Sequence, residues 1–121
     1  MNANPWPVQI KLLRGAKELA LVFDDGKLFQ LSAEYLRISS PSAEVQGHHP
    51  SQKIIVAGKK NIAINQIESV GNYAIRLIFD DGHDTGIYSW SYLYELGEAY
   101  HKNWASYLAA LKDKGLERNN F

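Results

Sequence analysis

Two pairs of aspartates are the first residues whose chemistry needs an explanation. Asp24 with Asp25, and Asp80 with Asp81, each directly precede a glycine. Paired carboxylates perform acid–base catalysis when burial separates their pKa values, and carboxylates also bind hard metal ions. An Asp-Gly step equally supplies the positive φ that a tight hairpin turn needs. Because apolar residues alternate on both sides of each pair, we expect two solvated hairpin turns rather than a catalytic site.

Four histidines make a metal site the second hypothesis. His48 and His49 lie in a long polar segment, His83 follows the second Asp-Gly step, and His101 lies in a helical pattern. Neither His-x-His nor His-x-x-x-His occurs, so no metal-binding spacing is present. We therefore expect surface histidines. The alternative is weak binding of zinc or iron by His83 together with His48 and Glu44.

Other catalytic motifs are missing from the sequence. The glycines of the turns are spread singly, so there is no phosphate-binding loop or dinucleotide fingerprint. Ser39, Ser40 and Ser42 lack the strand–turn–helix setting of a hydrolase nucleophile. The chain has no cysteine, which excludes disulfides and thiolate metal sites. We expect no enzymatic activity, and keep a small enzyme with a pocket of perturbed acids and bases as the alternative.

The composition indicates one globular domain over residues 1–121. Hydrophobic residues make up 45% and charged residues 21%, and 13 basic side chains balance 13 acidic ones. Nucleic-acid and polybasic membrane binding both need a basic excess, so neither partner is expected. No apolar run approaches the roughly 20 residues of a membrane span. Residues 1–6 do not resemble a secretory signal, so we expect a cytoplasmic protein with a frayed tail over residues 116–121.

Period-two alternation of apolar residues predicts the strands that carry the two Asp-Gly turns. The predicted strands cover residues 8–12, 18–23, 28–31, 54–56, 62–70, 73–79 and 85–88, with a bulge or break expected inside 62–70. The expected fold class is therefore α+β, with antiparallel β-hairpins forming a small sheet.

Serines mark the expected helix starts. Ser32 precedes a short helix over residues 33–37, and Ser89 precedes a second helix that Gly97 either ends or interrupts. The C-terminal helix is amphipathic. We expect it to pack through Leu96, Tyr100, Trp104, Tyr107 and Leu111. Residues 39–52 are expected to form a loop.

The two halves of the chain resemble each other. Phe-Asp-Asp-Gly occurs at residues 23–26 and 79–82, and a returning strand and a serine-capped helix follow each copy. Duplication explains this pattern, and so does the general similarity of Asp-Gly hairpins. Both explanations stay open.

A dense aromatic group lies in the second half, at Tyr88, Trp90, Tyr92 and Tyr94. Alternate members point to different sides, so some are expected at the surface, where tyrosine and tryptophan favour binding. The alternative is that these side chains cover the edge of the sheet.

Several segments resemble the bacterial DUF971 family, the gamma-butyrobetaine hydroxylase-like N-terminal domain. The resemblance extends from about residue 7 to residue 111 and rests on residues 35–37, 40–45, 71–75 and 79–88. In carnitine-synthesis oxygenases the related domain precedes the catalytic jelly roll, and a similar domain is appended to some iron–sulfur carrier ATPases. The resemblance therefore implies an accessory domain without the oxygenase half.

The related oxygenase domain also implies a structural zinc, held by three cysteines and a histidine. Those positions correspond here to Ser40, Ser42 and Val45, and to His83. Hydroxyl and isopropyl groups do not replace zinc thiolates, so no cofactor is expected. We expect the serines to bond local backbone groups, Val45 to bury apolar surface, and His83 to tie the loop to the second hairpin through a loop carbonyl.

These observations predict a non-catalytic accessory or protein-interaction module, linked through its family to iron–sulfur or oxygenase cofactor pathways. The alternative is a metal-binding protein that uses His83 with loop ligands.

Overall fold

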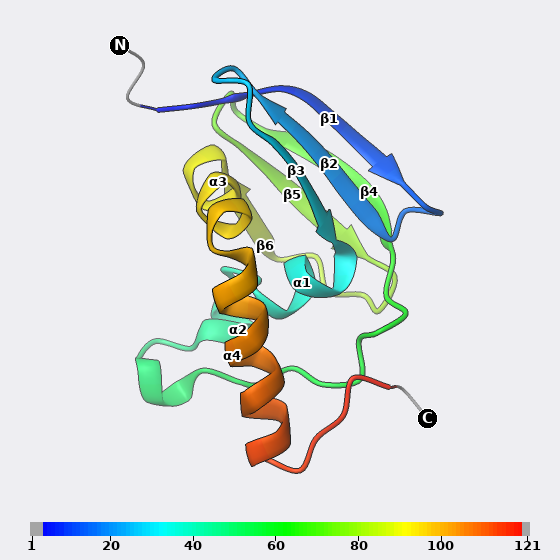
Figure 1. Ribbon diagram of the computed structural model, residues 1–121, viewed down its shortest axis with the longest axis vertical. Helices are drawn as coiled ribbons and strands as arrows, with labels where there is room; N and C mark the ends of the chain where they lie inside the picture. Colours follow the sequence, from blue (N-terminus) through cyan, green and yellow to red (C-terminus); the bar gives the residue numbers. More distant parts are fainter. Residues whose placement is uncertain (1–3, 120–121) are drawn as a thin grey trace.

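Six strands in the computed structural model, which describes residues 4–119, form two antiparallel sheets instead of the single sheet we expected. The first sheet contains β1 (Pro7–Leu13), β2 (Glu18–Phe23) and β3 (Leu28–Ser32) in chain order. The second sheet contains β4 (Ile64–Val70), β5 (Ala74–Phe79) and β6 (Gly86–Ser89). Figure 1 shows the second sheet behind the first. The expected α+β class is confirmed.

The core lies along the central strand of each sheet. Its main strand residues are Leu19, Leu21 and Phe23 on β2 and Ile75, Leu77 and Phe79 on β5, all at most 2% exposed. These side chains belong to one hydrophobic cluster. Full burial of one such side chain stabilises a fold by about 1.5–3 kcal/mol, so the alternation in these two strands does most to hold the sheets together.

The helices are α1 (Ala33–Ile38), α2 (Ala43–Gln46), α3 (Trp90–Glu98) and α4 (Tyr100–Asp113), with a 3₁₀ turn η1 (Pro50–Gln52). Both predicted caps are confirmed. The Ser32 hydroxyl accepts a hydrogen bond from the Tyr35 main-chain N–H at 3.0 Å, and Ser89 accepts one from Tyr92 at 3.1 Å. Within residues 4–119, no helix has both the length and the apolar character needed to cross a bilayer.

The C-terminal apolar stripe is divided between α3 and α4, which meet at Ala99. Gly97 lies inside α3, where a Cβ atom would come within 2.4 Å of the Phe29 ring. The expected packing of this stripe is confirmed: Leu96, Tyr107 and Leu111 are buried, and Tyr100 and Trp104 are half-buried against the core. Trp104 stacks on Tyr100 at a ring-centroid distance of 6.2 Å.

The segment between the sheets differs most from expectation. The predicted loop over residues 39–52 contains α2 and η1, and the predicted strand over residues 54–56 is absent. Its backbone has no ladder partner in the described chain, although Ile54 donates one hydrogen bond to Val45 at 2.8 Å. A β-branched run forms a strand only when another strand pairs with it.

Residues 116–119, which we expected to fray, are bonded to the rest of the fold. The main-chain N–H groups of Gly58 and Lys60 donate to the carbonyls of Glu117 and Arg118. Arg118 also contacts the buried Glu34 carboxylate with two hydrogen bonds of 2.8 and 2.9 Å. The remaining two residues of the expected tail, 120–121, lie outside the described residues.

The two halves share the order strand, strand, strand, helix. Each also has a register shift near the start of its first strand, between Pro7 and Gln9 and between Ile64 and Gln66. The predicted irregularity in residues 62–70 is therefore confirmed as a bulge. The same architecture is built twice, around two similar turns.

Candidate functional site

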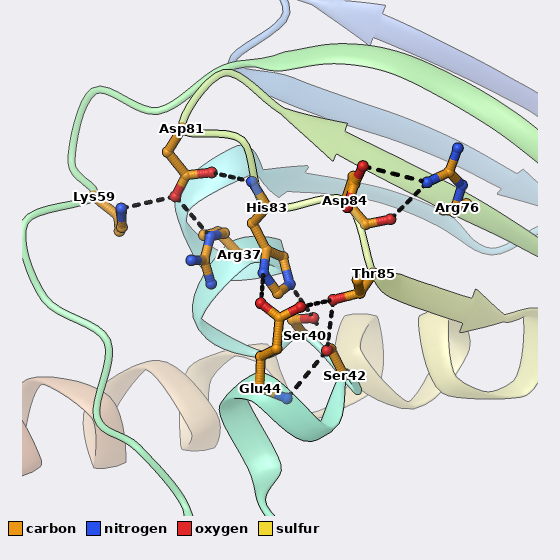
Figure 2. Close-up of polar contacts among 10 residues, drawn as sticks. All are labelled: Arg37, Ser40, Ser42, Glu44, Lys59, Arg76, Asp81, His83, Asp84 and Thr85. Carbon is orange, nitrogen blue, oxygen red and sulfur yellow. Dashed lines mark hydrogen bonds and ion pairs between the residues drawn. The ribbon is translucent and has the colours of Figure 1, made fainter.

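The second Asp-Gly hairpin brings His83 against the segment that joins α1 and α2 (Figure 2). Its Nε2 atom lies 2.8 Å from the Ser40 hydroxyl, and its Nδ1 atom lies 3.7 Å from a Glu44 carboxylate oxygen. The imidazole is 3% exposed and Ser40 is fully buried. His83 ties the loop to the hairpin, as expected, but its partner is a hydroxyl and not a loop carbonyl.

A short chain of hydroxyl contacts completes this cluster (Figure 2). The Ser42 hydroxyl accepts from the Glu44 N–H at 3.2 Å and lies 2.7 Å from the Thr85 hydroxyl, which donates to the Glu44 carboxylate at 2.7 Å. The Ser40 hydroxyl accepts from the Ser42 N–H at 3.3 Å. Val45 is 2% exposed. Two of the three positions that carry cysteine in the related zinc domain thus lie in the His83 network, and both bond within the loop.

Asp81 is the most strongly held acid of the cluster. Its carboxylate accepts from Arg37 Nε at 2.9 Å, Lys59 Nζ at 2.7 Å and the His83 N–H at 3.0 Å. Burial opposes ionisation, but these donors outweigh it and lower the pKa of Asp81 to about 2. The turn was predicted correctly, but the side chain is only 18% exposed, so the expectation of a solvated carboxylate is wrong here.

The order Ser40, His83, Glu44 resembles a serine–histidine–acid nucleophile. Its geometry does not support catalysis, because a nucleophile must reach substrate and the Ser40 side chain is buried. Burial, followed by the nearby Arg37 charge, lowers the pKa of His83 and favours the neutral imidazole. The arrangement acts as a structural tie between the loop and the hairpin.

Of the groups proposed to bind a metal ion, only His83 and Glu44 lie near each other in the described chain. Across residues 4–119, no three His, Asp or Glu side chains converge where a metal ion could bind, so His48 does not join His83 and Glu44. His48, His49 and His101 are exposed. Zinc and iron sites need three or four protein ligands, and only His83 with Glu44 lie close to each other.

The aromatic group of the second half points mostly inward. Its polar atoms donate within the chain: Tyr88 to the Leu36 carbonyl, Trp90 to the Asn72 carbonyl, Tyr92 to the Ser39 carbonyl and Tyr94 to the Asp25 carboxylate. Tyr88 is completely buried and the other three are half-buried. These contacts favour the structural interpretation of the group over the interface interpretation.

A groove that the sequence did not reveal lies between the segment after η1 and helices α3 and α4. Its volume is about 390 Å³. Apolar side chains of the lining are Ile38, Ile54, Ile55, Val56, Leu96 and Ala110, and polar ones are Ser39, Gln46, Lys53, Tyr92, Glu95, Asn103, Ser106 and Tyr107. We call this the α4 groove. Its size suits a ligand or a short peptide. The β-branched run at residues 54–56 was the one sequence signal that pointed to this place.

Comparison with known proteins places the chain in a family. The family model "Gamma-butyrobetaine hydroxylase-like, N-terminal" matches residues 10–94. No curated protein matches. Two proteins solved in solution by NMR are similar: one is 42% identical with a TM-score of 0.84, covering 98% of this chain and 94% of its own. The other is 45% identical with a TM-score of 0.83, covering 100% and 90%.

A third similar structure supports the same assignment. It is a crystal structure of a DUF971-family protein with unknown function from Acidithiobacillus ferrooxidans. It is 34% identical with a TM-score of 0.63, and the match covers 75% of this chain and 91% of that one. These matches show that the chain belongs to the gamma-butyrobetaine hydroxylase-like N-terminal (DUF971) family.

Proposed function

We propose that this chain is a non-catalytic accessory module that binds a protein partner through the α4 groove. The observation that carries the proposal is the groove itself, a concavity of about 390 Å³ lined by both apolar and polar side chains. Binding sites are typically concave and mostly apolar, with a few polar groups that orient the ligand. Ile54, which lines the groove, is 55% exposed.

The state of the titratable groups supports a binding role over an enzymatic one. The candidate nucleophile, Ser40, is buried, and the His83 and Asp81 side chains already contact partners within the chain. Neither Ser40 nor His83 lines the α4 groove. Catalysis needs reactive groups in a cavity that substrate enters, and here the groups and the cavity are separate. The family resemblance extends the proposal to partners in iron–sulfur or oxygenase cofactor pathways, by analogy of fold.

A matched pair of alanines on α4 tests the proposal. Ala110 lines the groove, whereas Ala109 is exposed and lies outside its lining. Ala110→Trp should fill the groove, and Ala109→Trp should leave it open. Each variant and the wild type, immobilised at equal amounts, is used to capture proteins from a bacterial lysate. We expect the proteins captured by wild type and Ala109→Trp to be lost with Ala110→Trp. Equal capture by all three would refute the proposal.

Metal binding is the second candidate function, favoured by one observation: the Glu44 carboxylate lies 3.7 Å from His83 Nδ1. Two ligand groups from neighbouring elements hold a metal ion weakly unless further ligands join them. This candidate therefore needs Ser42 or Thr85 to reorganise, and the metal measurement in the Discussion tests it.

A further inference from the structure

The segment that follows α4 lies against the segment that forms one wall of the α4 groove. In Figure 1 residues 116–119, coloured red, lie beside the green segment that leads from η1 to β4. Two carbonyls of residues 116–119 accept the main-chain N–H groups of Gly58 and Lys60, at 2.9 and 3.0 Å. The wall of the groove, residues 53–56, comes shortly before these two donors in the chain. We call residues 116–119 the C-terminal strap.

The side chain of Arg118 fastens this strap to two helices. Its Nε and Nη2 atoms donate to the two carboxylate oxygens of Glu34 on α1, at 2.9 and 2.8 Å. Its guanidinium carbon lies 5.1 Å from the centre of the Trp104 ring on α4, in a cation–π contact. A bidentate pair of arginine and carboxylate is strong for a hydrogen-bonded contact and fixes the orientation of both groups. One residue of the strap thus contacts both α1 and α4.

The burial of Glu34 makes its pairing with Arg118 important for the strap. The Glu34 side chain is 5% exposed, whereas that of Arg118 is 37% exposed. A buried carboxylate that loses its cation is strongly unfavourable unless water reaches it. The strap belongs to no helix or strand, and segments held by few contacts open at a low cost in free energy. Loss of the pair should therefore displace the strap and leave the two sheets folded.

The wall of the groove is held at both ends. Ile54 donates its N–H to the Val45 carbonyl at 2.8 Å at one end, and the strap accepts its two hydrogen bonds just beyond the other end. Between them, the Tyr107 hydroxyl of α4 donates to the Val56 carbonyl at 2.6 Å. The wall residues belong to no helix or strand. Their position relative to α4 therefore depends on these few hydrogen bonds.

We propose that the C-terminal strap holds the wall of the α4 groove in position, and that the pair between Arg118 and Glu34 keeps the strap in place. When the pair is broken, the strap loses its hydrogen bonds to the wall segment, and the wall becomes free to move relative to α4. Neither Arg118 nor Glu34 lines the groove, so a contact outside the groove controls its shape. This inference goes beyond the proposed function, because it holds whatever the groove binds.

Hydrogen exchange of the main-chain amides, followed by NMR on the full chain, tests the inference. Arg118→Met removes the ion pair and keeps an unbranched side chain. We expect the Gly58 and Lys60 amides to exchange about tenfold faster, the effect of losing a charged hydrogen-bonded pair. The Ile54 amide should exchange about threefold faster, because the wall is released at one end only. Amides of the central strands β2 and β5 should exchange at nearly the wild-type rate.

Two further variants make the test specific. Lys114→Met is the matched control, because the Lys114 side chain is exposed and has no partner within the described chain, and its exchange should equal that of wild type. Glu34→Gln removes the charge from the same pair without leaving a buried carboxylate. It should reproduce the pattern of Arg118→Met with smaller factors, and it serves in place of Arg118→Met if that variant does not fold.

Three results would overturn the inference. If Gly58 and Lys60 exchange faster while Ile54 keeps its wild-type rate, the strap does not hold the wall. If the amides of β2 and β5 are accelerated as much as those of Gly58 and Lys60, the pair stabilises the whole fold and not the strap. If no amide is accelerated in either variant, the pair does not hold the strap. The lysate capture by Ala110→Trp decides the proposed function separately from all three.

Discussion

The two Asp-Gly turns have the same local geometry and different surroundings. Gly26 and Gly82 have φ values of 88° and 91°, and each turn's second aspartate, Asp25 or Asp81, accepts a main-chain N–H two residues later at 3.0 Å. Glycine is needed at both positions because other residues rarely adopt such φ values. Within these few residues, the two halves of the molecule are interchangeable.

The two turns differ in the side chains that contact them from other elements. Each turn is held by the helix of the opposite half: Tyr94 of α3 donates to Asp25, and Arg37 of α1 donates to Asp81. Asp81 additionally binds Lys59, and its side chain is largely covered. Asp25 thus has one neutral side-chain donor from another element, whereas Asp81 has two cations. One local motif becomes a surface turn in one half and the centre of an ionic cluster in the other.

The largest difference should appear when each carboxylate is neutralised. Asp81→Asn keeps a side-chain oxygen for the turn but removes the charge that pairs with Arg37, which is 12% exposed. Leaving a covered guanidinium unpaired should lower the free energy of unfolding by about 2–3 kcal/mol. Asp25→Asn should change the urea midpoint at neutral pH much less. Equal losses in the two variants would show that the turns are equivalent.

The tie between His83 and the loop should contribute the next largest effect. Ser40→Ala removes the hydroxyl that contacts buried His83 Nε2 and should destabilise the chain by about 1–3 kcal/mol, the cost of an unsatisfied buried polar group. Ser39→Ala is the matched control, because the Ser39 hydroxyl has no hydrogen bond within the described chain. Denaturant unfolding of both variants measures the difference. A Ser40→Ala midpoint equal to that of Ser39→Ala would contradict the assigned role.

Acid should weaken the second turn selectively. The pKa of Asp81 is lowered from 3.8 to about 2 in the folded chain, so its contribution is present above about pH 4 and is lost as the pH falls toward about 2. His83, whose pKa is also lowered, adds a loss of the same sign that begins below 6.5. The melting temperature, measured across this pH range, should fall less steeply near pH 3 for Asp81→Asn than for wild type. Parallel curves would mean that Asp81 is not strongly paired.

Metal removal should have the smallest effect. The second turn carries the one histidine that matches the related zinc site, and Ser40 and Ser42 stand where thiolates would bind. We expect protein purified without a histidine tag to contain no stoichiometric zinc or iron. Its melting temperature should not change after chelator treatment. Roughly one equivalent of metal, together with a large fall in melting temperature on chelation, would establish the metal-binding alternative.

The elements that could be predicted are those with signals that act over a few residues. Alternation identified β2 and β5, the Asp-Gly steps identified both turns, and Ser32 and Ser89 identified the helix starts. The strand expected at residues 54–56 is absent because strand formation needs a partner, and no local pattern specifies that partner. The spacing of the apolar stripe predicted that Trp104 packs against the core, but not that its side chain is only half-buried there.

In the candidate site, too, the sequence indicated individual residues, whereas their contacts depend on segments that are distant in the chain. His83, Ser40 and Ser42 could be singled out from the sequence and the family resemblance, but not their mutual contacts, because the segments that carry them are far apart in the chain. The α4 groove arises from several elements at once, the segment at residues 53–56 and helices α3 and α4 among them. The one sequence signal for the groove was the β-branched run at residues 54–56. That run predicted a paired strand, whereas in the structure it is an unpaired segment that lines the groove.

The sequence by itself determined the α+β class, the repeated order of hairpin and helix, the helix caps and the family. It could do so because main-chain propensity, turn geometry and apolar periodicity depend on neighbouring residues. Only the tertiary structure decided that the six strands divide into two sheets and that Asp81 is paired with two cations while Asp25 stays at the surface. Those outcomes depend on which distant segments of the chain come into contact, because burial, charge pairing and strand pairing all arise from contacts between residues far apart in the sequence.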